Sequence, residues 1–302
     1  MPEEKSQEQK ICEKMDQIGR KIVVMSGKGG VGKTTVTVNL ANALVAQGHT
    51  VGILDTDLHG PNVAKMLGCE ENILAQSEDG NEIMPVVTPS GIKVVSLSFA
   101  LNDPDQAVVF RGPMKMSVIK QFLSDVRWGT LDYLLIDSPP GTGDEQLTVC
   151  QSIPAITGCI LVTTPQQVAI LDARRSVSFA RQLDLRIIGL VENISALICP
   201  DCGKEIPIFG KDGGKNLCMD MDVPFLGAVP MEIGLQQDED NGVNWIEKGE
   251  SKSAKVFKEI ASFIHASTKP SCSADIGYVP QGPECSPSSC ATCTLDCPSK
   301  KK

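Results

Sequence analysis

A glycine-rich loop with two lysines is the stretch of this chain whose residue types most directly imply chemistry. Residues 27–35 read G-K-G-G-V-G-K-T-T and satisfy the phosphate-loop pattern G-x-x-x-x-G-K-[ST]. Glycines let successive backbone N–H groups turn toward phosphate oxygens. Lys33 is expected to reach the β- and γ-phosphates, and the Thr34 hydroxyl to coordinate Mg²⁺. The loop therefore predicts a nucleotide site built from Gly27, Lys28, Gly29, Gly30, Val31, Gly32, Lys33, Thr34 and Thr35.

A second lysine, Lys28, follows the first glycine of the loop, although a generic phosphate loop needs only one. It is either a solvated surface charge or a charge that reaches the nucleotide of a second subunit, which would make hydrolysis depend on dimer geometry. A loop with this early lysine resembles the deviant phosphate loop of the MinD, ParA and nitrogenase-iron-protein group. In that group the early lysine acts across a homodimer interface, so the resemblance implies a homodimer and a catalytic role for Lys28.

Two carboxylates, Asp55 and Asp57, lie at the end of an apolar run over residues 51–55. Carboxylates at the C-terminal end of a strand lie over the crevice where sheets of this kind bind ligands. We expect Asp57 to orient the attacking water or accept a proton from it, and Asp55 to support Mg²⁺ through a water molecule. The alternative is a pair of turn or helix-cap aspartates.

A third carboxylate, Asp137, ends the apolar run L-L-I that begins at residue 134. An apolar strand that ends in aspartate is the Walker B arrangement, in which the carboxylate is held near the metal. The following P-P-G-T-G segment is expected to be a nucleotide switch, with a rigid proline turn as the alternative. Asn193 ends another expected strand, and its amide can pair with the adenine edge or cap a loop.

Cys199 and Cys202 form a C-x-x-C pair, which alone is ambiguous. It could be a redox pair, half of a zinc site or half of an iron–sulfur site. A zinc ribbon needs a second pair about 15–20 residues further on, where only Cys218 lies. Two chains would together supply four thiolates, which suit one [4Fe–4S] cluster on a dimer axis.

The last cysteines of the chain form a run C-x4-C-x2-C-x3-C-P. Its last three cysteines and the proline are similar to a ferredoxin run. Four thiolates so close in sequence could bind a second [4Fe–4S] cluster or zinc, and the alternative is a disordered tail whose cysteines have no structural role. The ligands of this expected second centre are Cys285, Cys290, Cys293 and Cys297.

Composition limits the classes of partner. The chain has 302 residues, a formal net charge of −9 and a pI near 5.0, which argues against non-specific nucleic-acid binding. The first ten residues are mostly charged and polar, unlike a signal peptide, and no apolar run reaches the length of a membrane span. We therefore expect a cytoplasmic protein without membrane or nucleic-acid partners. The chain has twelve cysteines, several of them grouped. In a reducing compartment, grouped cysteines more often bind metal or take part in redox chemistry than form disulfides.

Apolar runs alternate with stretches of helical pattern from residue 21 onward. Strands are expected over residues 22–25, 51–55, 92–97, 133–137, 159–163, 187–193 and 225–229, and helices over 33–47, 114–126, 169–183 and 251–267. This alternation predicts an α/β fold with a mostly parallel sheet and helices on both faces. Residues 1–20 read as a polar leader that could form a short helix, 21–268 as a P-loop ATPase domain with the C-x-x-C site, and 269–302 as an irregular Cys-rich tail.

Taken together, the motifs resemble the Mrp-type (ApbC-type) iron–sulfur carrier ATPases over about residues 20–265. The matching stretches are M-S-G-K-G-G-V-G-K-T-T, D-T-D-L-H-G-P-N, F-R-G-P-M, I-D-S-P-P-G-T-G-D, T-T-P-Q-Q-V-A-I-L-D-A-R-R, V-E-N-I-S, C-P-D-C-G and I-F-G-K-D-G-G. The resemblance implies an ATP-binding homodimer and a slow ATPase. It also implies a labile [4Fe–4S] cluster on the cysteine pair, delivered to apoproteins under nucleotide control.

This chain departs from the resembling family in two places. Residues 236–240 read Q-Q-D-E-D, where family members usually carry an arginine-containing segment near the nucleotide base. The Cys-rich tail is the second departure. Two other functions compete with cluster carriage: a MinD/ParA-like positioning ATPase and a nitrogenase-reductase-like electron donor. The acidic net charge disfavours the first, and the pairing of the cysteines as C-x-x-C disfavours the second.

Overall fold

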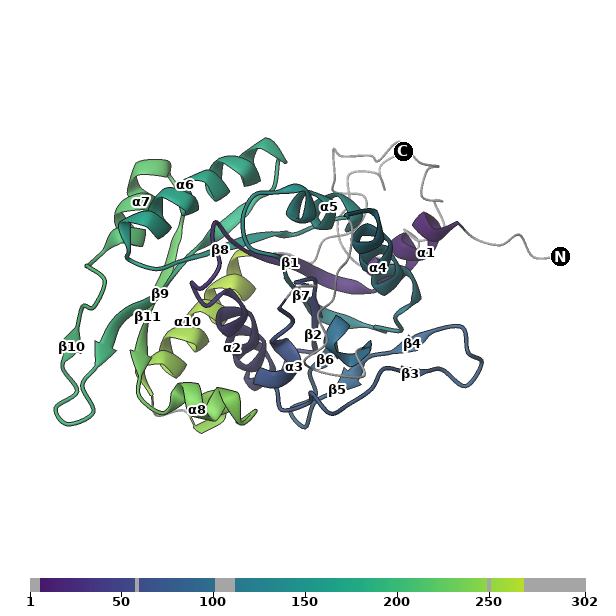
Figure 1. Ribbon diagram of the computed structural model, residues 1–302, viewed down its shortest axis with the longest axis horizontal. Helices are drawn as coiled ribbons and strands as arrows, with labels where there is room; N and C mark the ends of the chain where they lie inside the picture. Colours follow the sequence, from purple (N-terminus) through teal and green to yellow (C-terminus); the bar gives the residue numbers. More distant parts are fainter. Residues whose placement is uncertain (1–5, 58–59, 101–111, 249–250, 269–302) are drawn as a thin grey trace.

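The computed structural model describes residues 6–57, 60–100, 112–248 and 251–268, and the structural statements below concern them. A nine-stranded sheet with the order β10-β9-β8-β1-β7-β2-β6-β5, and with β11 beside β9, forms the centre (Figure 1). Its strands are β1 (Ile18–Ser26), β2 (Val51–Asp55), β5 (Val86–Val87), β6 (Lys93–Val95), β7 (Leu131–Asp137), β8 (Gly158–Thr163), β9 (Ile187–Ile198), β10 (Glu205–Ile206) and β11 (Phe225–Glu232).

Most neighbouring strands of this sheet run parallel. The pairs that join β6, β2, β7, β1, β8, β9 and β11 are parallel, whereas β5 and β10 pair antiparallel at the two margins. A short separate hairpin is formed by β3 (Ala75–Gln76) and β4 (Ile83–Met84). The predicted mostly parallel α/β fold is confirmed.

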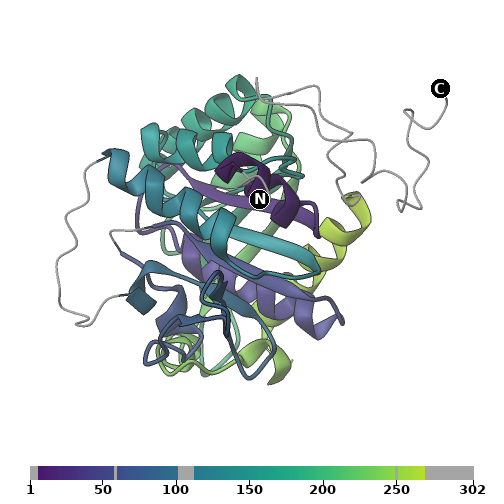
Figure 2. The same cartoon turned by 90° about the vertical axis from the view of Figure 1, so that its right-hand side faces the viewer.

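Helices cover both faces of the sheet, as Figure 1 and the rotated view in Figure 2 show. One layer holds α2 (Lys33–Ala46), α3 (Val63–Met66), α8 (Leu235–Asp240), α9 (Trp245–Lys248) and α10 (Lys252–Ser267). The other holds α1 (Gln7–Met15), α4 (Gly112–Asp125), α5 (Asp144–Ser152), α6 (Gln167–Gln182) and α7 (Gly213–Met221). A 3-10 turn, η1 (Leu97–Ala100), follows β6.

The central strands are apolar on both faces because both faces are covered. In β1, Ile22 and Val24 belong to the core under α2, whereas Val23 and Met25 belong to the opposite core. Since side chains alternate along a strand, a continuous apolar run supplies both layers. This is why the runs were recognisable as strands from the sequence.

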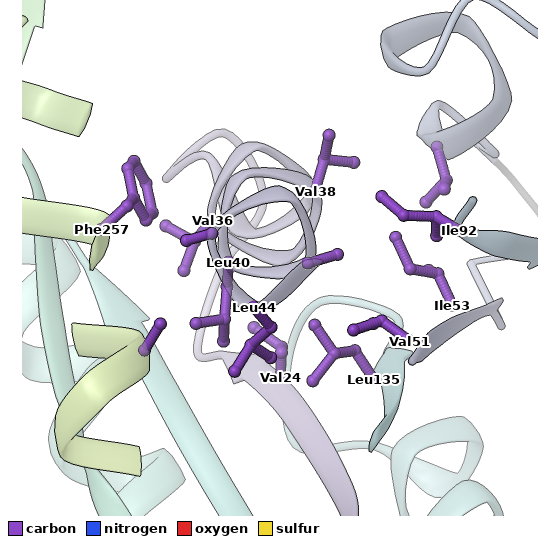
Figure 3. Close-up of a cluster of buried hydrophobic side chains, with 14 of the residues drawn as sticks. Val24, Val36, Val38, Leu40, Leu44, Val51, Ile53, Ile92, Leu135 and Phe257 are labelled. Atoms are coloured by element: carbon purple, nitrogen blue, oxygen red, sulfur yellow. The ribbon is translucent and has the colours of Figure 1, made fainter. Parts of the chain in front are cut away.

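Helix α2 is held against the sheet along its whole length. Figure 3 shows Leu40 and Leu44 directed toward Val24 of β1 and Leu135 of β7, and all four are fully buried. Phe257 of α10 packs beside α2 near Val36 and is also buried. This packing fixes the N-terminus of α2, which begins at the phosphate-loop lysine.

The predicted leader over residues 1–20 contains the helix α1. Ser6 and Gln9 form a capping box that starts α1. Ile11 and Met15, four residues apart on one face of α1, are buried, and the helix packs against α4. β1 then begins at Ile18 rather than after residue 20.

Strand β9 is longer than the expected strand over residues 187–193 and continues to Ile198. Its pairing with β8 ends at Glu192, and β10 pairs with it further along, at Leu197 and Ile198. The extension carries the chain into the β9–β10 hairpin, seen at the lower left of Figure 1. Within the described ranges no helix is both long and apolar enough to span a bilayer.

Candidate functional site

The carboxyl ends of the central strands bring the predicted nucleotide-handling residues to one edge of the sheet. β1 lies between β7 and β8, and β2 lies on the other side of β7. The phosphate loop follows β1, Asp55 ends β2 and Asp137 ends β7, with Asp55 directly opposite Asp137 in the strand register. Ligands in open α/β sheets bind at this edge.

The phosphate loop depends on glycines at defined positions. Gly30 and Gly32 have φ angles of 77° and 80°, in the region that favours glycine. A Cβ at Gly27 would lie 2.3 Å from the backbone oxygen of Asp172, and one at Gly32 would lie 2.1 Å from Asn193 Nδ2. Gly32 is also the N-cap residue of α2, and no side chain there accepts a hydrogen bond from the first backbone N–H groups of the helix. The first amides of α2 are therefore available to an anion.

Substitution of Gly32 by alanine should destabilise the fold by about 3 kcal/mol, because left-handed strain and a clash with Asn193 act together. Gly29→Ala is the matched control, since a Cβ there meets no atom within 4 Å. It should change the free energy of unfolding by less than about 0.5 kcal/mol. Urea unfolding of the two variants measures both values. Equal losses would contradict this account of the loop.

A compact polar cluster joins the loop to Asp137. Thr34 Oγ1 donates a hydrogen bond of 2.7 Å to Asp137 Oδ2, and Thr37 Oγ1 donates one of 2.7 Å to Oδ1. Lys33 Nζ lies 2.7 Å from Asp137 Oδ2. The buried ammonium of Lys33 makes no well-aligned hydrogen bond to any described residue. Phosphate oxygens would satisfy its remaining N–H groups, so this lysine fits a nucleotide.

Asp55 completes the charge distribution of the cluster. It is buried and accepts hydrogen bonds from Ser96 Oγ at 3.0 Å and from the Asp57 backbone at 3.1 Å. Burial, and next the charge of Asp137, raise the pKa of Asp55 to about 8. Asp55 and Asp137 are two buried carboxyl groups with one ammonium group, that of Lys33, beside them. A bound cation would therefore stabilise their ionised forms. Together with the Thr34 hydroxyl they form an oxygen-rich set that suits Mg²⁺.

A cleft of about 540 Å³ opens over the loop. It is lined by the phosphate loop, Asp57, Asn62 and Pro140 of the segment after β7. The end of β11, α8 and Trp245 also line it. This volume is typical of small-molecule sites. The fold, the loop and the cleft define the protein as a P-loop NTPase.

Asn193 lies where β9 passes under the loop. Its Nδ2 donates a hydrogen bond of 3.0 Å to the backbone oxygen of Val31, and the side chain is buried. The amide nitrogen thus supports the loop in this structure, and the predicted contact of Asn193 with adenine stays a prediction. Asn193 also lines the cleft.

The cysteine pair lies at the tip of the β9–β10 hairpin. Cys199 donates its backbone N–H to Lys204 and accepts one from Gly203, both at 2.9 Å. Cys202 is exposed and Cys199 half-buried. The backbone N–H of Cys202, then that of Asp201, and then the Cys202 side chain lower the pKa of the Cys199 thiol. A lowered pKa favours the thiolate, the form that binds metal.

The other described cysteines differ in environment. Burial raises the pKa of Cys150 and Cys159 to about 12, and that of Cys69 to about 11. Within the parts of the chain that the structure describes, no group of three or more His, Cys, Asp or Glu side chains could hold a metal ion. The Cys199/Cys202 pair is therefore at most half of a four-thiolate site. Cys285, Cys290, Cys293 and Cys297 lie outside the described residues, and their predicted centre is untested.

Several large apolar side chains of the segments next to the cysteine hairpin are exposed. They come from β10, from the segment after it and from the end of β11: Ile206, Ile208, Phe209, Met231 and Ile233. The largest exposure, 67%, is that of Ile233. Large apolar side chains that stay exposed can contribute to a protein interface when they gather on one face.

Sequence reasoning missed two polar residues of this region and gave no role to a third. Thr37 donates a hydrogen bond to one oxygen of Asp137, and Ser96 donates one to Asp55. Glu239, in the segment expected near the base, lines the cleft. Thr37 lies one turn of α2 beyond Lys33, a spacing that could have indicated its direction. Nothing in the sequence identifies Ser96, because its contact arises from the pairing of β6 with β2.

Comparison with known proteins gives the family. The model described as ParA, NUBPL iron-transfer P-loop NTPase, matches residues 17–265. This chain therefore belongs to the NUBPL iron-transfer P-loop NTPases, and the resemblance seen in its motifs is confirmed. The iron-sulfur cluster carrier protein of Methanocaldococcus jannaschii is 49% identical over 258 residues, covering 85% of this chain and 88% of that protein.

More distant similarities are consistent with this assignment. The cytosolic Fe-S cluster assembly factor NUBP2 homolog of Nematostella vectensis is 46% identical over 225 residues, which cover 73% of this chain and 83% of that protein. A nucleotide-binding protein of Archaeoglobus fulgidus, solved with ADP, has a TM-score of 0.71 at 37% identity over 83% of this chain and 96% of its own. The Pyrococcus furiosus cell division ATPase MinD has a TM-score of 0.57 at 27% identity and covers 82% of this chain and 99% of its own.

Proposed function

We propose that this protein is an ATP-dependent iron–sulfur cluster carrier that holds a [4Fe–4S] cluster between two subunits and transfers it to apoproteins. The observation that carries the proposal is the pair of thiols at a hairpin tip, with Cys202 exposed and Cys199 half-buried, near exposed apolar side chains in the sequence and without further ligands among the described residues. Two copies of the pair supply the four thiolates that such a cluster needs. The names of the curated relatives support the same cargo.

The nucleotide is the second part of the proposal. Lys33 would contact the β- and γ-phosphates, and Thr34, Asp137 and, through water, Asp55 would hold Mg²⁺, which supplies charge stabilisation when bound. Asp57 lines the cleft and would accept the proton of the water that attacks the γ-phosphorus while the bond to the leaving ADP oxygen breaks. We expect a slow ATPase, and an ADP-bound structural relative supports nucleotide binding.

The paired strands β9 and β11, whose register shifts between Val229 and Met231, offer a route by which nucleotide could influence the cluster. Asn193 of β9 and Val229 of β11 line the cleft and lie opposite each other in register. Four positions further along β9, Leu197 pairs with Met231, directly before the cysteine hairpin. Because β9 and β11 connect both sites, a change of the cleft on nucleotide binding can shift the hairpin.

Cluster transfer to an apoprotein tests the proposed function directly. The reconstituted protein is mixed anaerobically with an apo-ferredoxin of the [4Fe–4S] type and a ferrous-iron chelator, with and without Mg·ATP. We expect the acceptor to gain the cluster while the chelator gains little iron. Complete capture of the iron by the chelator would show release into solution and contradict the carrier function.

Lys28 tests the dimer part of the proposal. It is half-buried and lines the cleft beside Gly29. If its ammonium contacts the nucleotide of the partner subunit, Lys28→Ala should keep the Kd for ATP within about threefold and lower kcat about a hundredfold. Calorimetric titration and phosphate release measure the two quantities. A lowered affinity with an unchanged kcat would indicate a role in its own subunit's cleft instead.

The competing functions predict different chemistry at the hairpin. A MinD-like positioning ATPase shares this fold, as the MinD likeness indicates, but gives no role to a pair of thiols at a hairpin tip, one of them with a lowered pKa. An electron donor of the nitrogenase-reductase kind would keep its cluster through repeated reduction. The carrier instead loses its cluster to the acceptor, so the transfer assay separates them.

A further inference from the structure

Glu239 is a carboxylate in the nucleotide cleft to which the proposed chemistry gives no role. It belongs to α8, and it lines the cleft together with Gln236 and Asp240 of the same helix. Its side chain is half-buried, and burial raises its pKa although hydrogen bonds from Asn39 and Trp245 oppose that shift. A carboxylate withdrawn from water in a cleft is stabilised when a ligand supplies hydrogen-bond donors.

One oxygen of Glu239 is fixed by its neighbours and the other is not. Oε1 accepts a hydrogen bond of 2.6 Å from Asn39 Nδ2 and one of 3.3 Å from Trp245 Nε1. Asn39 is itself anchored, because Nδ2 also donates to the backbone oxygen of Thr35 at 2.9 Å. Among the described residues no donor contacts Oε2 of Glu239. The carboxylate is therefore oriented, with one acceptor atom left for a ligand.

The anchor ties this acceptor to the first turns of α2, next to the phosphate loop. Thr35 is the last residue of the loop, and Asn39 lies about one helical turn, roughly 5.4 Å, further along α2. A nucleotide whose phosphates occupy the loop continues from the phosphates into its sugar. A negative carboxylate would repel a phosphate at this depth, whereas it complements hydroxyl donors.

We propose that Glu239 is a specificity-determining residue that accepts a hydrogen bond from the ribose hydroxyls and so selects ribonucleotides over 2′-deoxyribonucleotides. The inference rests on the proposed nucleotide function of the cleft. Acidic side chains bind ribose hydroxyls in the same way in dinucleotide-binding sheets. The apolar side chains of Val229, Pro230 and Leu235 in the same cleft offer a surface for the base.

The test compares the Kd of Mg·ATP, Mg·2′-deoxyATP and Mg·GTP by calorimetry on the full chain. The variants are Glu239→Gln, which keeps the shape, and Glu239→Leu, which removes both acceptors. Asp238→Asn is the charge-matched control on the same helix, because Asp238 does not line the cleft. The thermal unfolding midpoint of each variant reports whether it is folded.

We expect the wild type and Asp238→Asn to bind ATP about tenfold more tightly than 2′-deoxyATP, the size of one charge-assisted hydrogen bond. In Glu239→Gln the ratio should fall to about threefold or less, and in Glu239→Leu to about one. Equal binding of both nucleotides by the wild type would overturn the inference and leave the nucleotide site intact. No binding of any nucleotide by the wild type would instead contradict the proposed function.

Two other outcomes would also overturn the assignment to ribose. Equal weakening of ATP and 2′-deoxyATP in Glu239→Gln would mean that Glu239 acts only through Asn39 and Trp245. A changed ratio of ATP to GTP, with the ratio of ATP to 2′-deoxyATP preserved, would mean that Glu239 contacts the base.

Discussion

Replacement of Lys33 by alanine should lower kcat/KM for Mg·ATP about a thousandfold, the largest effect expected of a single side chain at this site. Its buried ammonium lies 2.7 Å from Asp137 Oδ2 and makes no well-aligned hydrogen bond to a described residue, which leaves its donors to the phosphates. Alanine would also leave Asp55 and Asp137 without the nearest compensating charge. Steady-state phosphate release and calorimetric titration of ATP measure the loss.

Lys215→Ala is the matched control, since Lys215 is exposed on α7 and does not line the cleft. It should leave kcat/KM within about twofold of the wild type. The assignment of the loop as the site of ATP hydrolysis would be wrong if Lys33→Ala retained the kinetics of this control. Thermal unfolding of both variants excludes misfolding as the cause of a difference.

Replacement of Cys199 and Cys202 together by alanine should remove about four iron atoms and four sulfides per dimer after anaerobic reconstitution. The two thiols share a hairpin tip, and the lowered pKa of Cys199 favours the thiolate that iron requires. Cys12→Ala, on α1, is the control and should lose none. Iron that persists in the double variant would be assigned to the predicted tail centre. Unchanged iron in the double variant would exclude the hairpin as the cluster site.

Much of the fold could be predicted from the sequence because its central strands are buried on both faces. Runs such as residues 133–137 are continuously apolar, and helical stretches separate them, so the parallel α/β class follows. Helix α1 was harder to predict, since only Ile11 and Met15 mark its buried face within a polar segment. The extension of β9 depends on its pairing with β10, a short antiparallel contact that local pattern does not reveal.

The phosphate loop and the strand-end carboxylates could be predicted because the chemistry of each is local in sequence. The contacts between these groups could not be predicted, because they depend on strand register. The register places Asp55 opposite Asp137 and brings the Ser96 hydroxyl to Asp55. Glu239 lies in residues 236–240, the segment that we expect to differ from the family. Its significance appears only when α8 packs near α2 and Asn39 fixes its carboxylate.

Native mass spectrometry under anaerobic conditions tests the central claim most directly. The sample is the full chain with alanine at the tail cysteines, Cys285, Cys290, Cys293 and Cys297, reconstituted with iron and sulfide, so that only the hairpin pair can hold a cluster. We expect one species with the mass of two chains and a single [4Fe–4S] cluster. A cluster carried by one chain alone, or a dimer that never contains iron, would contradict it.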